Sequence, residues 1–285
     1  MERKTIEIIY EPNSRAKLGW IKTWVRLIKN IIESWDLVYQ LFKRDFFMSY
    51  KKSFLGMAWL VITPIMGILS WVFMDKTGIL APGDVGIPYP AYVLISSSIF
   101  GLFMGFFGAA SGTLSAGQGF IMQVKFPHDV LLVKQLLQQL AGFIITFIIS
   151  IIALLFSGVV PSWMIVLFPL MIIPMMLLAS AIGLICSVIA VVATDINRGI
   201  GFLMGLVMYI TPVIYSSKVD NPTLQKIIQY NPLTYLVGCV RDAFIYGKID
   251  HLDRYLISSA ASLILFLIAW RVFYISEEKV IEKMI

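Results

Sequence analysis

The chain has 285 residues, of which 59% are hydrophobic and only 14% are charged, and its mean hydropathy is +0.84. Because about a quarter of the residues in an average soluble protein are charged, this composition excludes a soluble enzyme and indicates an integral membrane protein. The net charge of +6 does not indicate nucleic acid binding: eleven of the 23 Lys and Arg residues precede residue 54, ahead of the first long apolar stretch, as in a segment on a membrane surface.

The first 53 residues predict amphipathic helices rather than a span. Residues 15–32 place Lys22, Arg26 and Lys29 on one helical face and apolar side chains on the other, so this helix is expected to lie in the membrane surface. Residues 33–52 repeat the pattern with an aromatic stripe. Charge interrupts the whole segment, which does not fit a signal peptide. An anchor and a docking face for a cytoplasmic partner are both open interpretations.

Charge-free stretches predict six membrane spans. The longest stretch is divided by turn-forming residues around Gly158 and Pro161. The expected spans are 54–74, 91–114, 136–157, 163–192, 199–215 and 254–274. The fourth contains Pro169 and Pro174, so a tilt or a kink is expected there.

The segment between the fifth and sixth spans contains two apolar stretches, broken by Asn231 and Pro232, that are too short to cross a membrane. We expect two short re-entrant helices there, which need protein or water around their backbone. An even number of spans puts both termini on one side. Segments assigned to the inside hold 17 Lys and Arg residues and those outside hold 6, so both termini are expected in the cytoplasm.

The predicted fold class is therefore an all-α integral membrane protein with six transmembrane helices, an N-terminal amphipathic interfacial helix and re-entrant helices between spans five and six. We divide it into a cytoplasmic interface region (1–53), a six-span domain (54–276) and a cytoplasmic tail (277–285).

The residues predict no catalytic, metal or cofactor site. The sequence has no phosphate-binding loop, no paired carboxylates, no Ser-His-Asp set, and cysteines and histidines without ligand spacing. The expected spans carry ionisable groups only in their end turns, whereas ion-driven carriers keep them at mid-membrane depth. Uphill transport would therefore need energy from a partner. A channel is an alternative.

Two features of the spans suggest a packed helical assembly with an aromatic path. Gly101 and Gly105, and then Gly108 and Gly112, allow close helix approach, although ordinary packing explains them as well. Seven aromatic side chains are candidates to line a conduit, because rings stack on sugars without requiring one particular sugar; the alternative is a core or lipid-facing position. They are Trp59, Trp71, Phe103, Phe106, Phe107, Tyr209 and Tyr215.

Five motifs in register resemble the membrane subunits of bacterial ATP-binding-cassette exporters of polysaccharide, which carry O-antigen, capsule and teichoic acid. The matching residues are Arg44, Asp45, Phe46, Tyr50, Ser53, Leu55, Gly56, Trp59 and Pro64; Lys125 to Pro127, Asp129 and Leu131; Thr194 to Ile196; Thr211 to Tyr215; and Asn231 to Thr234 with Arg241. The resemblance covers roughly residues 34 to 276.

This resemblance implies a homodimer bound to two separate nucleotide-binding subunits, which hold ATP and Mg. The complex would export a lipid-linked polysaccharide across the bacterial inner membrane. It also implies three sets of functional residues. The residues implied at the substrate entry are Tyr39, Arg44, Tyr50 and Lys51. Those implied in coupling to the ATPase are Lys125, Phe126, Pro127, His128 and Asp129. Those implied at the outer gate are Pro212, Asn231 and Pro232.

Two other functions are kept as alternatives. The same architecture would serve a teichoic acid exporter or an exporter of a small hydrophobic compound. A membrane-embedded glycan enzyme would need converging charged groups, and the aspartates expected on the outer side form no recognisable motif, so solvated loop charges explain them better. They are Asp75, Asp84, Asp242, Asp250 and Asp253.

Overall fold

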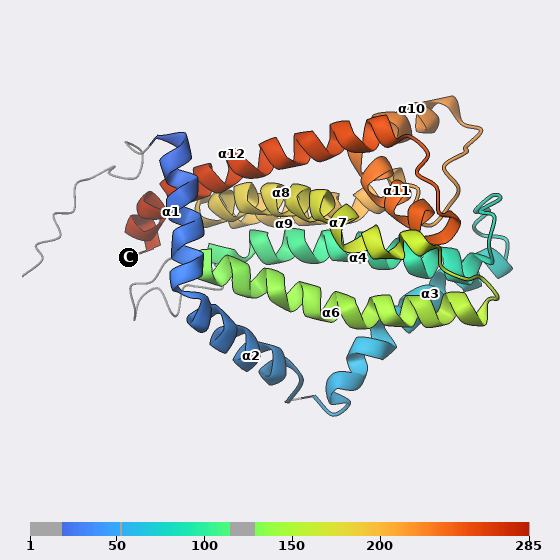
Figure 1. Cartoon of the computed structure of the whole chain (residues 1–285), viewed down its shortest axis with the longest axis horizontal. Coiled ribbons are helices and arrows are strands. Elements are labelled where there is room, and N and C mark those ends of the chain that lie inside the picture. Colours follow the sequence, from blue (N-terminus) through green and yellow to red (C-terminus); the bar gives the residue numbers. More distant parts are fainter. Residues whose placement is uncertain (1–18, 52, 115–128, 285) are drawn as a thin grey trace, which may run out of the picture.

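The computed structural model describes residues 19–51, 53–114 and 129–284, and within these ranges it contains helices and connecting turns but no strand (Figure 1). The elements are α1 (Trp20–Glu33), α2 (Trp35–Lys51), the 3-10 helix η1 (Gly56–Ala58), α3 (Trp59–Lys76), α4 (Tyr89–Ser111), α6 (Asp129–Phe156), η2 (Trp163–Leu167), α7 (Phe168–Met171), α8 (Ile173–Val192), α9 (Thr194–Leu206), η3 (Val207–Ile210), α10 (Pro222–Tyr230), α11 (Pro232–Tyr246) and α12 (Leu252–Met284).

Within the described ranges, five helical segments are long and apolar enough to cross a membrane, which confirms an all-helical, multi-pass fold. They correspond to the first, second, third, fourth and sixth expected spans. Their bounds are Gly56–Lys76, Tyr89–Ser111, Asp129–Phe156, Trp163–Val191 and Leu252–Ser276.

The fifth expected span lies five residues earlier in the chain than predicted. Its helix begins at Thr194 and ends with η3 at Ile210, so the expected helical continuation to residue 215 is wrong. The reason lies in Pro212, which lacks a backbone N–H and disfavours helical geometry in the residue before it. Thr211 accordingly has an extended conformation, with φ −113° and ψ 132°.

Two other spans differ from their expected form. The fourth is interrupted at Ile172, between α7 and α8. Pro169 and Pro174 lie in the first turns of these two helices, where proline is tolerated, so the interruption falls between the two prolines. The helix of the third span, α6, begins at Asp129 instead of residue 136 and so includes Lys134. The last helix, α12, continues to Met284, through most of the expected tail.

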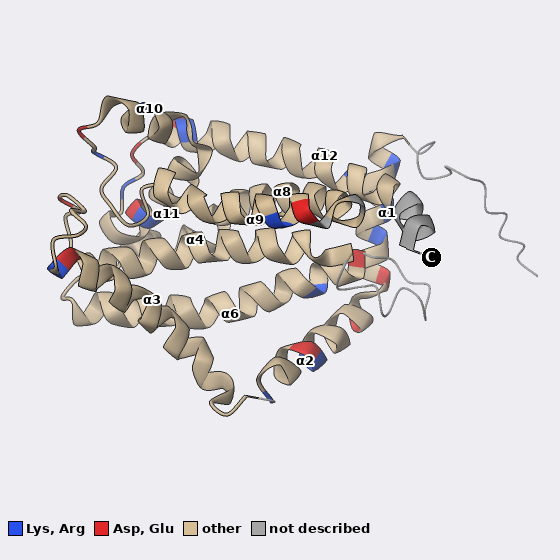
Figure 2. Cartoon of the chain, turned by 180° about the vertical axis from the view of Figure 1, so that it is seen from behind, with Lys and Arg blue, Asp and Glu red and all other residues tan. Residues whose placement is uncertain are grey.

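The long helices α4, α6, α8 and α12 run along one direction, and α1 crosses one end of this bundle (Figure 1). We call this end the α1 end and the opposite one, which carries α10 and α11, the α11 end. Helices α2 and α3 form a V beside α6, with the turn between them at its tip. Charged residues gather toward the two ends, and the middle parts of the long helices carry none (Figure 2).

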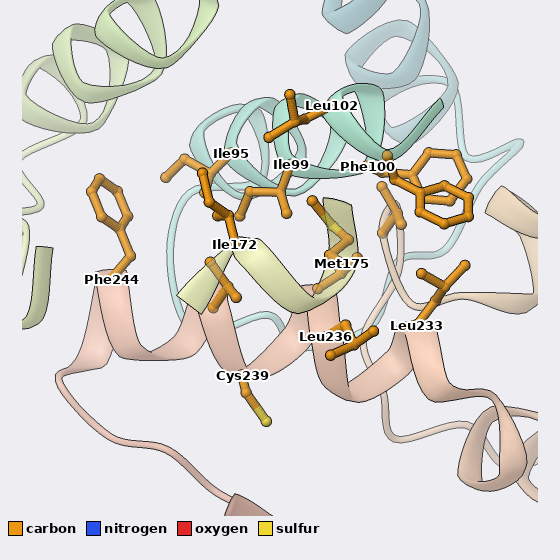
Figure 3. Close-up of a cluster of buried hydrophobic side chains, with 14 of the residues drawn as sticks. Ile95, Ile99, Phe100, Leu102, Ile172, Met175, Leu233, Leu236, Cys239 and Phe244 are labelled. Atoms are coloured by element: carbon orange, nitrogen blue, oxygen red, sulfur yellow. The ribbon is translucent and has the colours of Figure 1, made fainter. Parts of the chain in front are cut away.

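Helix α4 forms the centre of the core. Its side chains Ile95, Ile99 and Phe103 are fully buried, and they pack with residues from α8 and α11 (Figure 3). The closest helix approach involves Gly183 of α8: a Cβ atom there would lie 2.5 Å from the carbonyl oxygen of Phe107. Close packing of α4 against α8 thus depends on a glycine of its partner.

The N-terminal helices are present where the sequence predicts them. Helix α1 packs on α6 and α12 through Thr23 and Leu27, while Ile21, Val25 and Ile28 are exposed. An exposed apolar stripe beside cations fits a helix in a membrane surface, which stays a prediction.

Two short helices also follow the fifth expected span, on either side of Asn231 and Pro232. Asn231 caps α11, because its Oδ1 accepts a hydrogen bond of 3.0 Å from the backbone N–H of Leu233. Helix α11 is buried against α4, α7, α8 and α12, so protein surrounds its backbone. The re-entrant position of α11 in the membrane stays a prediction.

Candidate functional site

A cavity of about 650 Å³ lies between the C-terminal turns of α2 and helices α3, α4 and α6. This volume falls within the range of about 300–1,000 Å³ that is usual for small-molecule sites. The cavity lies beside the charge-free parts of three long helices, and thus at a depth where the surroundings are apolar.

The wall of this cavity combines aromatic rings with uncharged polar groups. The aromatic residues are Phe46, Tyr50, Trp59, Trp71 and Phe143, and the polar ones are Ser49, Thr63, Ser97, Ser98, Gln138, Gln139 and Thr146. No residue that lines the cavity is charged. Such a wall can stack on rings and form hydrogen bonds with neutral groups, but it offers no counter-ion to a phosphate.

One face of α3 forms the first wall. Trp59, Thr63, Gly67 and Trp71 of α3 line the cavity, and the Cα atoms of Trp59 and Trp71 are about 18 Å apart along the helix axis because they are separated by twelve residues. Gly67 lies between them in the sequence, and because it has no side chain it leaves space in this wall of the cavity.

The facing wall comes from α4 and α6, which are joined by a buried hydrogen bond of 2.9 Å between the hydroxyls of Ser98 and Ser150. Gly101 and Gly142 lie in this wall, and a Cβ atom at either would meet nothing within 4 Å, as at Gly67. Three glycines from three helices therefore keep the middle of the cavity open.

An ion pair positions α2 against α6, one helical turn from the cavity. The Nζ of Lys134 lies 2.8 Å from Oδ2 of Asp45, and Nε of Arg44 lies 2.7 Å from Oδ1. Burial by itself would raise the pKa of Asp45, but the hydrogen bonds and charges of Arg44 and Lys134 outweigh burial and lower this pKa below its ordinary value of 3.8. Asp45 is therefore ionised at neutral pH.

The structure places three of the sequence-predicted residues on the cavity: Tyr50, from the substrate-access set, and Trp59 and Trp71, from the conduit set. The other access residues do not line it. Tyr39 and Lys51 are exposed on α2, and Arg44 is engaged with Asp45. Their roles stay predictions.

The remaining conduit candidates lie elsewhere. Phe103, Phe106 and Phe107 are at most 5% exposed and belong to the core cluster around α4, so in this structure they face no cavity. Tyr209 stacks edge-on against Trp71 with ring centroids 6.4 Å apart, and the hydroxyl of Tyr215 donates a hydrogen bond of 2.9 Å to the carbonyl of Tyr209.

The predicted coupling residues Lys125, Phe126, Pro127 and His128 lie outside the described residues. Asp129, the last of this set, begins α6 and is 1% exposed; its Oδ1 accepts a hydrogen bond of 3.1 Å from Nε1 of Trp270 on α12. The start of α6 is thus tied to the last helix of the chain.

The outer-gate residues Pro212 and Asn231 lie close together. The side-chain amide of Asn231 donates hydrogen bonds to the Ile210 carbonyl (3.1 Å) and to Oγ1 of Thr211 (2.9 Å). Pro232 begins α11.

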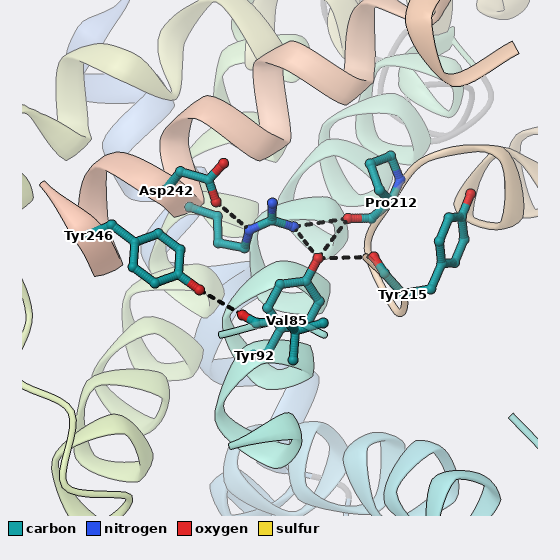
Figure 4. Close-up of polar contacts among 7 residues, drawn as sticks. Val85, Tyr92, Pro212, Tyr215, Asp242 and Tyr246 are labelled. Atoms are coloured by element: carbon teal, nitrogen blue, oxygen red, sulfur yellow. Dashed lines mark hydrogen bonds and ion pairs between the residues drawn. The ribbon is translucent and has the colours of Figure 1, made fainter. Parts of the chain in front are cut away.

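Residues 211–215 are held by a buried arginine (Figure 4). Arg241 is 4% exposed; its Nη1 donates to the Tyr92 hydroxyl (2.6 Å) and to the Pro212 carbonyl (2.9 Å), and its Nε donates to Asp242 (2.8 Å). Tyr92 in turn donates to the carbonyl of Tyr215 at 3.0 Å. We call Arg241, Tyr92, Asp242 and these carbonyls the Arg241 network.

Sequence reasoning missed most of the polar wall, in particular Ser97, Ser98, Gln138, Gln139 and Thr146. Only charged residues were weighed as polar signals in the spans. Two adjacent amides within an apolar helix were a signal as well, because an amide in apolar surroundings is unfavourable unless it finds a partner.

The comparisons with known proteins point to one family. A family model described as ABC-2 type transporter matches residues 36–245. A curated relative named O-antigen export system permease protein RfbA, from Myxococcus xanthus, is 23% identical over 260 residues, which cover 90% of this chain and 99% of the relative. Two proteins of the same name from Klebsiella pneumoniae are each 26% identical, over 80% and 76% of this chain and 87% and 83% of their own length.

Proposed function

Because the chain belongs to the ABC-2 type transporter family, we propose that it is the membrane permease subunit of an ATP-driven exporter of an O-antigen-like polysaccharide. The observation that carries this proposal is the wall of the cavity, where aromatic rings alternate with hydroxyls and amides and charge is absent. Sugars present apolar ring faces and many neutral hydroxyls, and this wall complements both. The names of the curated relatives support the same cargo.

We assign the energy source to a partner chain. Two nucleotide-binding subunits, with ATP and Mg, would bind the α1 end of a homodimer of this chain. The segment of residues 123–134 would receive their motion, and Asp129 would pass it to α12 through Trp270. Tyr39, Arg44, Tyr50 and Lys51 would lie at the access route for the lipid-linked head group.

The proposed membrane topology has six crossings, with α9 and η3 as the short fifth one, and with α10 and α11 re-entrant from the outer face. Both termini would then lie in the cytoplasm, at the bacterial inner membrane. The charge-free middle of the bundle supports the crossings (Figure 2), and the excess of Lys and Arg in the segments assigned to the inside supports the orientation. The α11 end, with Pro212, Asn231 and Pro232, would form the outer gate.

The test is ATP-driven transport by the isolated complex. The tagged chain is purified from its host in a mild detergent, the co-purifying subunits are identified by mass spectrometry, and the complex is reconstituted in vesicles with lipid-linked polysaccharide. We expect glycan transfer that needs ATP and stops when the ATPase is inactivated. Transfer driven by a proton or sodium gradient alone, or export of small hydrophobic compounds without glycan, would overturn the proposal.

A further inference from the structure

The side-chain amides of Gln138 and Gln139 stand out within the cavity. Both residues are half-buried, both line the cavity, and neither side chain hydrogen-bonds to another group in the part of the chain that the structure describes. An amide offers two donors and an acceptor, so this pair of side chains can both donate and accept hydrogen bonds inside the cavity. The site is therefore suited to a ligand that supplies both donors and acceptors.

Helix α4 makes room for one of these amides. A Cβ atom built on Gly105 would lie 2.6 Å from Oε1 and 3.3 Å from Cδ of Gln139, so only a glycine allows the amide its present position. The amide of Gln139 thus lies directly against the backbone of α4 at Gly105, and a larger residue there would displace it.

The neutral wall limits the class of ligand. A phosphate or a carboxylate would lack a cation among the residues that line the cavity. Hydroxyl groups both donate and accept, and an amide pair matches them. The indoles of Trp59 and Trp71 across the cavity provide flat apolar faces for a ring.

We propose that Gln138 and Gln139 form a hydrogen-bonding subsite for the hydroxyls of a neutral sugar, stacked against Trp59 or Trp71, within each single subunit. This inference rests on the proposed function and assigns its substrate contacts. It places sugar recognition between helices of one chain, with the charged part of the lipid carrier left outside the cavity.

The test is photo-crosslinking on the full-length chain in lipid nanodiscs. The probe is dodecyl maltoside that carries a diazirine on its sugar, and dodecylphosphocholine and unlabelled dodecyl maltoside are the competitors. We expect labelled peptides from α3 and α6, with label displaced by the maltoside and not by the phosphocholine. Label spread evenly over lipid-facing helices, or displaced equally by both competitors, would overturn the proposal.

Variants sharpen this test. Gln139→Leu should weaken specific labelling about two- to tenfold, as expected for one lost hydrogen bond. Gly105→Ala should weaken it as well, because the new methyl group displaces the Gln139 amide without removing it. Gly108→Ala adds the same methyl group one turn away, where it meets nothing within 4 Å and lines no part of the cavity, and it should leave labelling unchanged. Gel-filtration profiles and thermal melting confirm folding.

The failure of this inference is distinguishable from failure of the proposed function. If ATP-driven glycan export by the complex persists while Gln139→Leu binds the maltoside probe as well as wild type, the subsite is wrong and the exporter stands. If wild type shows no glycan export at all, the proposed function itself fails.

Discussion

The two ends of the bundle are held together by different kinds of contact. At the α11 end, one buried cation, Arg241, joins α11 to α4 and to the turn at Pro212 through two hydrogen bonds, and a third binds it to its neighbour Asp242. At the α1 end, the described contacts include three pairs between helices: Lys134 with Asp45, Trp270 with Asp129, and Trp24 with the carbonyl of Leu267 at 3.2 Å.

The Arg241 network and the Asp45 ion pairs differ both in their burial and in the number of hydrogen-bond partners that their residues share. The Arg241 side chain is 5% exposed and shares its partners with Tyr92, so loss of one bond disturbs several others. The Asp45 carboxylate is 27% exposed, and water can replace its partners. Regions with fewer buried contacts open first. We therefore expect the contact of α2 with α6 at Asp45 to open during transport while the α11 end keeps its internal contacts.

The largest effect is expected from Arg241→Met. This change leaves Asp242 and the Pro212 carbonyl with fewer partners in a buried site, and breaking a buried pair typically destabilises by about 3–5 kcal/mol. Thermal unfolding of the purified protein measures the loss. Arg254→Met, at an exposed arginine 3.8 Å from Asp253, should change stability by less than about 0.5 kcal/mol. Equal shifts for the two variants would contradict the special role of the Arg241 network.

A smaller effect is expected from Tyr92→Phe. The ring and its position over Arg241 (4.6 Å to the ring centroid) stay, but the hydroxyl that accepts from Arg241 and donates to Tyr215 is lost. Hydrogen bonds to charged groups contribute about 1.5–3 kcal/mol, and melting should show a loss of this size. The control is Tyr230→Phe, at an 84% exposed ring. A neutral result at Tyr92 would mean that the turn at Pro212 is held without this hydroxyl.

At the α1 end, Asp45→Asn should lower stability by no more than about 1 kcal/mol, because its ion pairs are partly exposed. Its effect on ATP-driven export should be larger, since α2 loses its tie to α6 beside the cavity. Export and melting are measured on the same preparation. Glu33→Gln, which breaks only the exposed pair with Lys29 (3.5 Å), is the matched control. A stability loss as large as that of Arg241→Met would erase the contrast between the ends.

The smallest effect concerns pH. Because the pKa of Asp45 is lowered in the folded protein, its contribution to stability is fully present above about pH 4 and is lost as the pH falls through that lowered pKa. Spin labels on α2 and α6 should report a constant distance from pH 7 to about pH 4 and a widening distance below. Asp45→Asn should lack this acid-dependent step. A change centred near pH 6 would implicate another group.

Much of the fold follows from the spacing of apolar and charged residues. Charge-free runs located the long helices, and the Asn231-Pro232 pair separated α10 from α11, because a side-chain cap and a proline at the first turn start a helix. Pro212 should have ended the fifth helix earlier, but the apolar run around it argued for continuation. The start of α6 was predicted too late because a charged residue such as Lys134 indicates a loop outside the membrane. Only the structure shows that this lysine is paired with Asp45 on another helix.

The candidate site was less predictable. Trp59 and Trp71 were selected for their aromatic rings and Tyr50 through the family resemblance, but the aromatic criterion also selected Phe103, which lies in the core. The presence of an aromatic ring does not show whether a side chain packs in the core or lines a cavity. The cavity depends on glycines from three helices, and that arrangement arises only from the packing between them.

Helix α12 is unbroken for 33 residues, roughly 50 Å. It packs along α8, the carbonyl of Leu267 near its middle accepts a hydrogen bond of 3.2 Å from Nε1 of Trp24, and near its first turn the hydroxyl of Tyr255 donates to the carbonyl of Met171 at 2.9 Å. A stiff rod supported along its middle acts as a lever: when one end shifts sideways, the far end swings the opposite way. We therefore expect a displacement of one end of α12 on one side of the membrane to be transmitted along the helix to its other end.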